Sequence, residues 1–575
     1  MKAVKYKTLT TKYMDDMDRD TPFADYPRPS MRRESYISLN GSWDFAVGGD
    51  KYPELYEEKI LVPYPPESLL SGIERDIPKG AVMYYRRSFS LPDGFVRGRI
   101  LLHFGAVDTI CEVKLNGTSV ISHEGGYLPF YADITDDLIP GENTLTVRVI
   151  DNLDHDYPYG KQKRNRGGMW YTPVSGIWQT VWLESVPDKY IEKIRITPSL
   201  DSATIEVFGG EDEKTVTLST GERFNFRGEK ITVKPEVAIN WSPENPHLYE
   251  FTLESGDDTI SSYFALRTVE CKECDGIPRL CLNGKPYLFN GLLDQGYYPD
   301  GIFLPATPEA YLDDILLAKS MGFNMLRKHI KVEPEIFYYL CDRQGICVFQ
   351  DMVNNSGYSF ILDTALPTVG PKSLPDSLRH LGKKSRKIFE EHSLQTLDCL
   401  YNHPSIVYYT VFNEGWGQFL ADKMYRIIKS ADPTRIVDAT SGWFWRKESD
   451  VDSRHVYFKA VKLGRVGKRP IVISEFGGYS HRVEGHLFGS NNYGYKLFSS
   501  DGELEDAVVR LYSEEIAPLI PQGVSGLVYT QISDVEDETN GIVTYDRRHV
   551  KLNAERIRPI MERLAKSIQS KESDR

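Results

Sequence analysis

The chain has 575 residues, too many for a single hydrophobic core, so we expect about three domains. Hydrophobic residues make up 41% and charged residues 26%, the balance of an ordinary globular protein. The net charge of −13 argues against a nucleic-acid or anionic membrane surface, because such partners require clustered Lys and Arg.

The ends of the sequence and its cysteines bear on location and metals. The first eight residues are basic but lead into no apolar stretch of signal-peptide length, and no run approaches a membrane span. Seven cysteines, an odd number, fit a reducing compartment, so we expect a cytoplasmic protein. Cys271 and Cys274 form the only CxxC pair, without a second pair or histidines nearby. We therefore predict no metal and no cofactor.

The first part of the chain, from about residue 36 to 186, reads as short alternating strands separated by Gly, Pro and Asn. Candidate strands lie at 85–90, 100–104, 111–115 and 145–149. Asn116 and Gly117, directly after the third of these, form a strong hairpin turn signal. This pattern predicts a β-sandwich, and the shorter alternating pieces from 188 to 268 predict a second, smaller one.

Beyond residue 280 the period changes, and helices of roughly 10 to 16 residues alternate with short strands. Gly322 and Gly345 each end a predicted helix just before a strand. Repeated βα units of this kind are typical of an eight-stranded barrel. The candidate strands are 287–290, 323–327, 346–351, 406–413, 435–439, 455–458, 471–474 and 526–531.

Two of these strands deliver a glutamate to their C-terminal ends, where such barrels place their chemistry. Glu414 follows the fourth strand and Glu475 follows the seventh. Strands four and seven lie across the barrel mouth from one another, so the two side chains can converge. Alone, each segment is also compatible with a core strand that ends in a solvated Glu.

Paired carboxylates at a barrel mouth suit hydrolysis of a glycosidic bond. One carboxylic acid protonates the leaving oxygen, and the other carboxylate attacks the sugar or activates water. A separation of roughly 5–5.5 Å implies a covalent intermediate with retention, whereas roughly 6.5–9.5 Å leaves room for water and implies inversion. The sequence leaves both alternatives open.

The chain resembles glycoside hydrolase family 2, the family of β-galactosidases, β-glucuronidases and β-mannosidases. The resemblance rests on Asn413-Glu414-Gly415-Trp416 and Ser474-Glu475-Phe476-Gly477, with the upstream segments 39–43, 175–184 and 241–249. It implies a sugar-binding-like jelly-roll β-sandwich over residues 1–187, an immunoglobulin-like β-sandwich over 188–268 and a catalytic (β/α)8 TIM barrel over 269–575.

The same resemblance implies a retaining mechanism with Glu414 as acid/base and Glu475 as nucleophile. Asn413 would hydrogen-bond the 2-hydroxyl of the sugar. Tyr457 resembles the tyrosine that donates to the nucleophile, and Arg327 resembles the arginine beneath it. For both, a structural hydrogen bond inside the barrel is the alternative.

Aromatic residues are expected to pack on the C–H face of the sugar ring. The candidates for this role are Trp416, Trp443, Trp445 and Tyr529, and for each one core packing is the alternative.

The choice of substrate departs from the family pattern. Asp294 and Gln295 replace a basic pair that is usual after the first barrel strand, whereas His329 matches the family position after the second. Asp294 suits recognition of vicinal hydroxyls, which favours a neutral hexoside of the galactose type.

A β-hexuronidase with a non-standard carboxylate site is the alternative. The segment 538–547 lacks the lysine with which glucuronidases hold the sugar carboxylate, but Lys328 or Lys331 could pair with a uronic acid. From another class, a catalytically inactive carbohydrate-binding protein or a scaffold remains open. The resemblance further implies a homo-oligomer, dimer or tetramer, and a β-glycoside as the partner, with no nucleic acid and no membrane.

Overall fold

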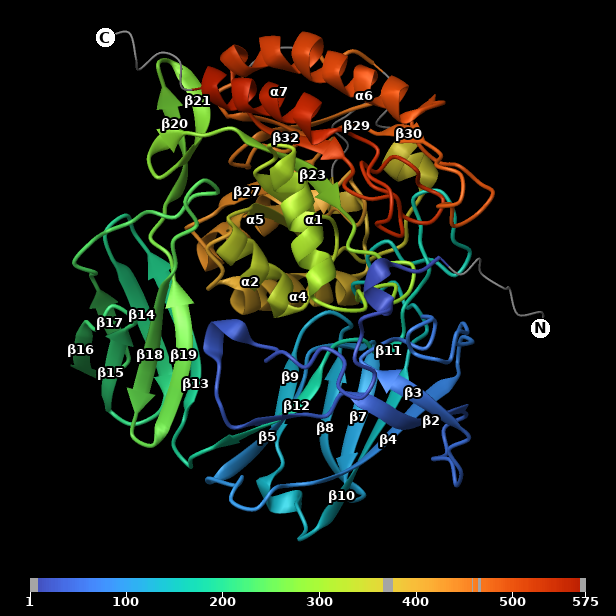
Figure 1. Cartoon of the computed structure of the whole chain (residues 1–575), viewed down its shortest axis with the longest axis vertical. Helices are drawn as coiled ribbons and strands as arrows, with labels where there is room; N and C mark the ends of the chain where they lie inside the picture. Colours follow the sequence, from blue (N-terminus) through green and yellow to red (C-terminus); the bar gives the residue numbers. More distant parts are fainter. Residues whose placement is uncertain (1–8, 366–375, 458, 464–466, 569–575) are drawn as a thin grey trace.

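The computed structural model describes residues 9–365, 376–457, 459–463 and 467–568. Figure 1 shows three regions: a blue to cyan sandwich, a smaller green one beside it, and a yellow to red barrel above both. Among the residues within these ranges, no helix is long and apolar enough to cross a membrane. All seven cysteines are free.

The first sandwich consists of a six-stranded sheet in the order β3-β2-β4-β10-β7-β8 and a four-stranded sheet in the order β1-β12-β5-β9. The short strands β11 and β6 form a separate pair. Alternation decides which side chains enter its core: along β10 every second residue is buried. The strands are β1 (Tyr36–Ser38), β2 (Gly41–Gly48), β3 (Glu58–Val62), β4 (Val82–Ser90), β5 (Arg99–Phe104), β6 (Val107–Asp108), β7 (Ile110–Leu115), β8 (Thr118–Glu124), β9 (Phe130–Asp133), β10 (Glu142–Ile150), β11 (Gly176–Ile177) and β12 (Val181–Val186).

The turn between β7 and β8 lies where the sequence predicts it. Asn116 and Gly117 have φ angles of 51° and 88°, the left-handed conformation that a tight type I′ hairpin requires at both central positions.

The smaller sandwich pairs a three-stranded sheet, β13-β14-β17, with a four-stranded sheet, β16-β15-β18-β19, around one apolar core. A three-stranded antiparallel sheet in the order β20-β21-β22 then leads to the barrel. The immunoglobulin-like topology and the domain boundaries at 187 and 268 stay predictions. The strands are β13 (Ile191–Pro198), β14 (Ala203–Gly209), β15 (Glu213–Leu218), β16 (Arg223–Arg227), β17 (Lys230–Val233), β18 (Tyr249–Ser255), β19 (Asp258–Phe264), β20 (Val269–Cys274), β21 (Ile277–Leu282) and β22 (Lys285–Pro286).

The C-terminal region is the predicted barrel of parallel strands, in the order β27-β26-β25-β24-β23-β32-β29-β28. Most of the strand residues are buried on both faces, as in a sheet enclosed by helices. The strands are β23 (Phe289–Asp294), β24 (Met325–Lys328), β25 (Cys347–Asp351), β26 (Ile406–Asn413), β27 (Ile436–Ser441), β28 (Asp452–Val456), β29 (Ile471–Gly477) and β32 (Val524–Thr530), with β30 (Tyr479–His481) and β31 (Lys496–Phe498) outside the barrel.

Helices alternate with these strands. They are α1 (Glu309–Ser320), α2 (Glu335–Gln344), α4 (Lys383–Leu400), α5 (Ala421–Ala431), α6 (Asp501–Arg510) and α7 (Ala554–Ser567). The short helical turns are η1 (Lys12–Met14), η2 (Pro29–Met31), η3 (Thr135–Asp137), η4 (Phe360–Ala365), η5 (Asp376–Leu378), η6 (Leu511–Ile516) and η7 (Ala517–Gln522).

The predicted number and order of barrel strands are confirmed, and the positions of two strands are corrected. The first strand, expected at 287–290, spans Phe289–Asp294. The sixth strand, expected at 455–458, spans Asp452–Val456. β27 and β28 are the two ends of the hydrogen-bonded sheet order, so the barrel has a seam there. Side chains bridge this seam, since the hydroxyl of Ser441 on β27 lies 2.9 Å from Nε2 of His455 on β28.

Candidate active site at the mouth of the barrel

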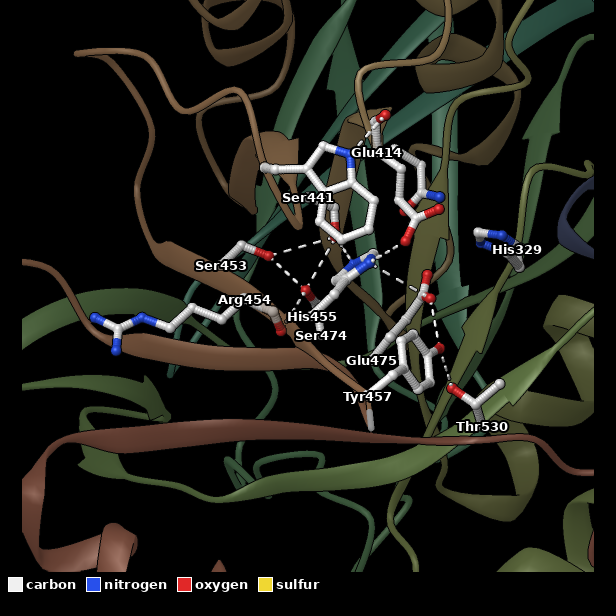
Figure 2. A network of polar contacts seen from close by, with 12 residues as sticks. His329, Glu414, Ser441, Ser453, Arg454, His455, Tyr457, Ser474, Glu475 and Thr530 are labelled. Atoms are coloured by element: carbon white, nitrogen blue, oxygen red, sulfur yellow. Dashed lines mark hydrogen bonds and ion pairs between the residues drawn. The ribbon is translucent and has the colours of Figure 1, made fainter. Parts of the chain in front are cut away.

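Glu414 comes directly after β26 and has a left-handed backbone with φ of 52°. This conformation is strained for a glutamate, and it turns the chain sharply out of the strand. The Glu414 N–H donates to the carbonyl of Ser441 on β27 at 2.9 Å. Gly415 follows because a Cβ there would lie 2.2 Å from the ring of Phe444. The result, seen in Figure 2, is a carboxylate that points toward His455 and Glu475.

Glu475 lies near the end of β29 and is only 5% exposed. The Tyr457 hydroxyl donates to its Oε2 at 2.7 Å, and Nη1 of Arg327 lies 3.2 Å from Oε1. Burial by itself raises the pKa of this carboxyl, but the charges of His455 and Arg327 and the Tyr457 hydrogen bond outweigh it and lower the pKa to about 2. Glu475 is therefore ionised throughout the neutral range.

The two carboxylates meet. An oxygen of Glu414, an oxygen of Glu475 and a ring nitrogen of His455 all lie within 4.8 Å of one another (Figure 2). Glu414 and Tyr457 line a cavity of about 1670 Å³. Oxygens this close favour direct attack of one carboxylate on the sugar over attack by an intervening water, which requires roughly 6.5–9.5 Å between the carboxyl groups.

Arg327 organises the floor of the site. Its Nη2 donates to Oδ1 of Asn413 at 2.8 Å, and its Nε donates to Asp351 at 3.0 Å. Asn413, the residue before the acid, is thus held by its oxygen, and its side-chain amide N–H groups are left to bind other acceptors. His329 shares Asp351, with Nδ1 2.6 Å from Oδ2. Burial lowers the pKa of His329 to about 4, so its ring is neutral.

Asp294, which the sequence analysis predicts to bind the sugar hydroxyls, is instead bound to other protein groups. Its Oδ2 accepts from Nζ of Lys328 at 2.5 Å, and its Oδ1 accepts from the N–H of Gly296 at 2.8 Å. Lys328 and Lys331 both also contact Oε1 of Glu333 at 2.9 Å. Because these ionic groups are buried and satisfied inside the protein, the geometry gives no support to a substrate-binding role for Asp294, Lys328 or Lys331.

The predicted aromatic residues separate into two groups. Trp443 and Trp445 line the cavity, and the indole N–H of Trp443 donates to the carbonyl of Glu414 at 3.0 Å. Trp416 and Tyr529 are only 5% and 2% exposed and belong to the apolar core. For these two the packing alternative is the one that fits the structure.

Sequence reasoning missed His455. Its Nδ1 lies 2.8 Å from Oε1 of Glu414 and 3.5 Å from Oε2 of Glu475, so one atom contacts both carboxylates. A signal was present, because His455 and Tyr457 both lie in the predicted strand 455–458, and residues i and i+2 of a strand share a face.

A contribution of the sandwiches to the pocket is expected from the sequence, but the residues of the first sandwich that form this wall are not the ones that the sequence indicated. Tyr171 donates to Oε2 of Glu538 at 2.6 Å, and Tyr159 donates to the carbonyl of Ser356 at 2.8 Å. Between them Trp170 lines the cavity. These residues belong to the segment 151–175, which crosses from the sandwich to the barrel mouth. No local sequence pattern predicts such a contact, because the contact depends on how the domains pack against each other.

Comparisons with known proteins agree with this architecture. Residues 73–187 match the model for the sugar-binding domain of glycosyl hydrolases family 2, and residues 278–548 match the model for the TIM barrel domain of that family. The β-galactosidase of Aeromonas hydrophila subsp. hydrophila is 28% identical over 482 residues, which cover 74% of this chain and 43% of that protein. The β-galactosidase of Priestia megaterium is 24% identical, covering 86% and 52%.

The chain spans about half the length of these curated relatives. Among solved structures, the β-D-glucuronidase of Dictyoglomus thermophilum superposes with a TM-score of 0.72 at 20% identity, covering 94% of this chain and 98% of that one. A β-galacturonidase of Eisenbergiella tayi bound to galacturonate gives 0.67 at 21% identity, covering 93% and 98%. These structures share the fold. The matched sandwich and barrel domains, together with the paired glutamates at the barrel mouth, show that the chain belongs to glycoside hydrolase family 2.

Proposed function

We propose that the chain is a retaining exo-β-glycosidase that hydrolyses terminal β-linked hexosides through a covalent glycosyl-enzyme intermediate. The observation that carries the proposal is that one oxygen of Glu414, which lines the cavity, lies within 4.8 Å of one oxygen of Glu475. Carboxylates this close support direct displacement, because attack by water requires roughly 6.5–9.5 Å between the carboxyl groups.

In the first step, Oε of Glu475 attacks the anomeric carbon while Glu414 gives its proton to the glycosidic oxygen. The bond to the aglycone breaks, the aglycone leaves as an alcohol, and an ester joins the sugar to Glu475. In the second step the Glu414 carboxylate takes a proton from water, whose oxygen attacks the anomeric carbon. The ester breaks, and both glutamates return to their original states.

The surrounding residues fit these steps. The low pKa of Glu475, about 2, keeps the nucleophile ionised. The side-chain amide of Asn413, held through its oxygen by Arg327, is oriented to donate to the sugar 2-hydroxyl. Trp443 and Trp445 offer apolar faces along the cavity.

For the glycone we propose a β-galactoside first. The names of the curated relatives support this choice, since both are called β-galactosidases. The internal pairing of Lys328 with Asp294 and of Lys331 with Glu333 argues the same way, because neither ammonium is free for a sugar carboxylate. Arg547 is likewise engaged with Asp314, at 3.2 Å.

A β-hexuronide is the second candidate, and Lys161 is the observation that favours it. Lys161 follows Gly160, where an added Cβ would lie 2.9 Å from the carbonyl oxygen of Ile330, the residue after His329. Its charge acts on two groups at the mouth: after burial, it is the next largest influence on the pKa of His329 and of Glu538. Among the ion pairs of the described residues, none includes Lys161. A half-buried ammonium in this position suits a sugar carboxylate.

The test is a panel of p-nitrophenyl β-glycosides that includes the galactoside, glucoside, mannoside, glucuronide and galacturonide. A 2-fluoro sugar with a good leaving group should add one sugar mass to the peptide that contains Glu475. If a uronide is the best substrate, Lys161→Met should raise its KM about 10-fold or more and leave the KM for neutral glycosides within about 2-fold. Sugar binding without turnover of any glycoside would favour the inactive binding protein instead.

We also retain a cytoplasmic location and a homo-oligomer as proposals. The seven free cysteines agree with a reducing compartment.

A further inference from the structure

We propose that His455 is the shared counter-ion of the two catalytic carboxylates: a buried imidazolium that balances Glu475 in the resting enzyme and Glu414 once the glycosyl ester has formed. This inference rests on the proposed function. It makes His455 a positioning residue, since it acts through the two glutamates that it contacts.

A single ring nitrogen faces both carboxylates. Nδ1 of His455 lies 2.8 Å from Oε1 of Glu414 and 3.5 Å from Oε2 of Glu475 (Figure 2). The side chain of His455 is fully buried, whereas that of Glu414 is 22% exposed toward the cavity. Because the second Glu414 oxygen is not needed by His455, it is left to carry the proton that the aglycone requires.

The opposite side of the ring fixes the second proton. Nε2 lies 2.9 Å from the hydroxyl of Ser441. Ser441 gives its only hydrogen to the hydroxyl of Ser474, 3.0 Å away, so it accepts from Nε2–H of His455. Ser474 in turn lies 2.6 Å from Ser453, and all three serines are buried. Nε2 therefore carries a hydrogen, and the proposal places a second one on Nδ1, because that atom faces an oxygen of each glutamate.

The local fold holds the ring in this place. His455 pairs with Glu475 in the parallel register of β28 and β29, and the register shifts just before it, where Ser474 is skipped. Such a bulge re-aims side chains. Gly442 closes the other side, because a Cβ there would lie 2.8 Å from Nδ1 of His455. Trp443 meets the ring edge-on, with centroids 5.6 Å apart.

Other ionisable groups surround this centre from each neighbouring strand. Arg327 from β24 and Tyr457 after β28 both bind Glu475. Tyr495 stacks on Tyr457, and Asp438 from β27 lies beyond Ser453. Arg454, next to His455 on its own strand, is paired with Asp452 at 2.5 Å. Among these groups His455 is the one placed between Glu414 and Glu475.

The imidazolium keeps the combined charge of Glu414, Glu475 and His455 the same before and after ester formation. Before the reaction, Glu475 is a carboxylate and Glu414 carries a proton, so the trio with His455 has no net charge. After ester formation Glu475 is neutral and Glu414 has lost its proton, so the trio is again neutral. The imidazolium stays in place, 2.8 Å from Glu414 and 3.5 Å from Glu475, while the negative charge passes from Glu475 to Glu414. No charge is left unbalanced in a buried site, which favours both steps.

The test is His455→Asn, which keeps a polar group near the position of Nδ1 but cannot carry a charge. Removing a cation makes both glutamates hold their protons more tightly, so both limbs of the kcat/KM pH profile should move to higher pH by about one to three units. The rate at the optimum should fall about 100-fold on alkyl β-glycosides. Ser441→Ala, which removes the acceptor of Nε2–H, should shift the profile in the same direction by less.

His403→Asn is the matched control. His403 is also a fully buried histidine held by an aspartate, with Nδ1 2.7 Å from Asp342, but it lies away from the catalytic pair. The His403→Asn substitution should lower thermal stability and leave both limbs of the kcat/KM pH profile at their wild-type positions. Thermal melts of every variant establish that the proteins are folded.

The outcomes separate the two proposals. The wild type could be active while the pH profiles of His455→Asn and Ser441→Ala have the same limbs as the wild-type profile and differ only in rate. That result overturns the role of His455 and leaves the proposed function intact. A wild type that turns over no glycoside overturns the proposed function and the counter-ion role with it. If His455→Asn fails to fold, the Ser441→Ala profile decides.

Discussion

Two charged clusters lie at the same end of the barrel, and they differ in what their charges face. In the closed cluster, Asp294 binds Lys328, and Lys328 binds Glu333, with both Lys328 and Glu333 fully buried. In the open cluster, Glu475 is held by protein groups on one side, while Glu414 is 22% exposed toward a cavity. Both follow or end parallel strands, and both contain carboxylates next to cations.

A carboxylate at a strand end is not by itself a functional group. In the closed cluster every carboxylate has a cation or an N–H donor from the protein, so nothing is left for a ligand. In the open cluster, Glu414 retains an oxygen for the cavity, and the amide of Asn413 is held but not consumed. Four substitutions test this distinction, in order of decreasing expected effect.

Glu475→Gln should abolish turnover of every substrate, by at least about 10³-fold in kcat, because a carboxamide cannot form the glycosyl ester. The change is nearly isosteric, and the Tyr457 hydroxyl can still donate to it, so the variant should fold. Steady-state kinetics on an aryl β-glycoside measure the loss, and a thermal melt serves as the control. Substantial residual turnover would contradict the assignment of Glu475 as nucleophile.

Glu414→Ala should reduce kcat/KM for alkyl glycosides by about 10² to 10⁴-fold and spare ester formation from activated aryl glycosides. The reason is that only a poor leaving group needs a proton as it departs. The ratio of the two losses is the measurement. Equal losses for both classes would mean that Glu414 does not act as the acid.

Asp294→Asn should act on stability and not on chemistry. It leaves Lys328 buried with a single carboxylate, and breaking such a buried pair costs about 3–5 kcal/mol in the free energy of unfolding. Denaturant unfolding measures this cost, while kcat and KM of the folded variant should stay within about 3-fold of wild type. A raised KM at unchanged stability would place Asp294 in the substrate site after all.

Glu67→Gln tests a buried carboxyl that has a hydroxyl partner instead of a cation. Glu67 is bound by Ser175, and burial raises its pKa to about 8. Between the unfolded-state value of roughly 4.3 and about 8, the folded protein keeps a proton that the unfolded chain releases. The free energy of unfolding of the wild type therefore falls as pH rises through this window.

Glutamine has no proton to lose, so the melting temperature of the variant should exceed that of wild type by about 2–4 °C at pH 8.5 and not at pH 5. Thermal melts at the two pH values measure the difference. A difference that does not depend on pH would show that Glu67 is ionised in the folded protein.

Much of the barrel and its two principal carboxylates can be predicted from the sequence alone. Strand periodicity is a local property, so eight apolar segments indicated eight parallel strands, and Glu414 and Glu475 fell at the ends of the fourth and seventh. The left-handed turn at Asn116 was readable for the same reason, because backbone conformation there depends on two neighbouring residues.

Which polar groups remain available depends on the tertiary structure. Asp294 ends β23 and has both oxygens bound within the protein, by Lys328 and Gly296, whereas His329 follows β24 and is bound to Asp351 through Nδ1. Trp416 is a candidate from the sequence for packing on the sugar ring, but its side chain belongs to the hydrophobic core. His455 gained its place through a register shift between β28 and β29. The energy of a buried charge depends on every group within a few ångströms, and those groups come from strands and loops far apart in the chain.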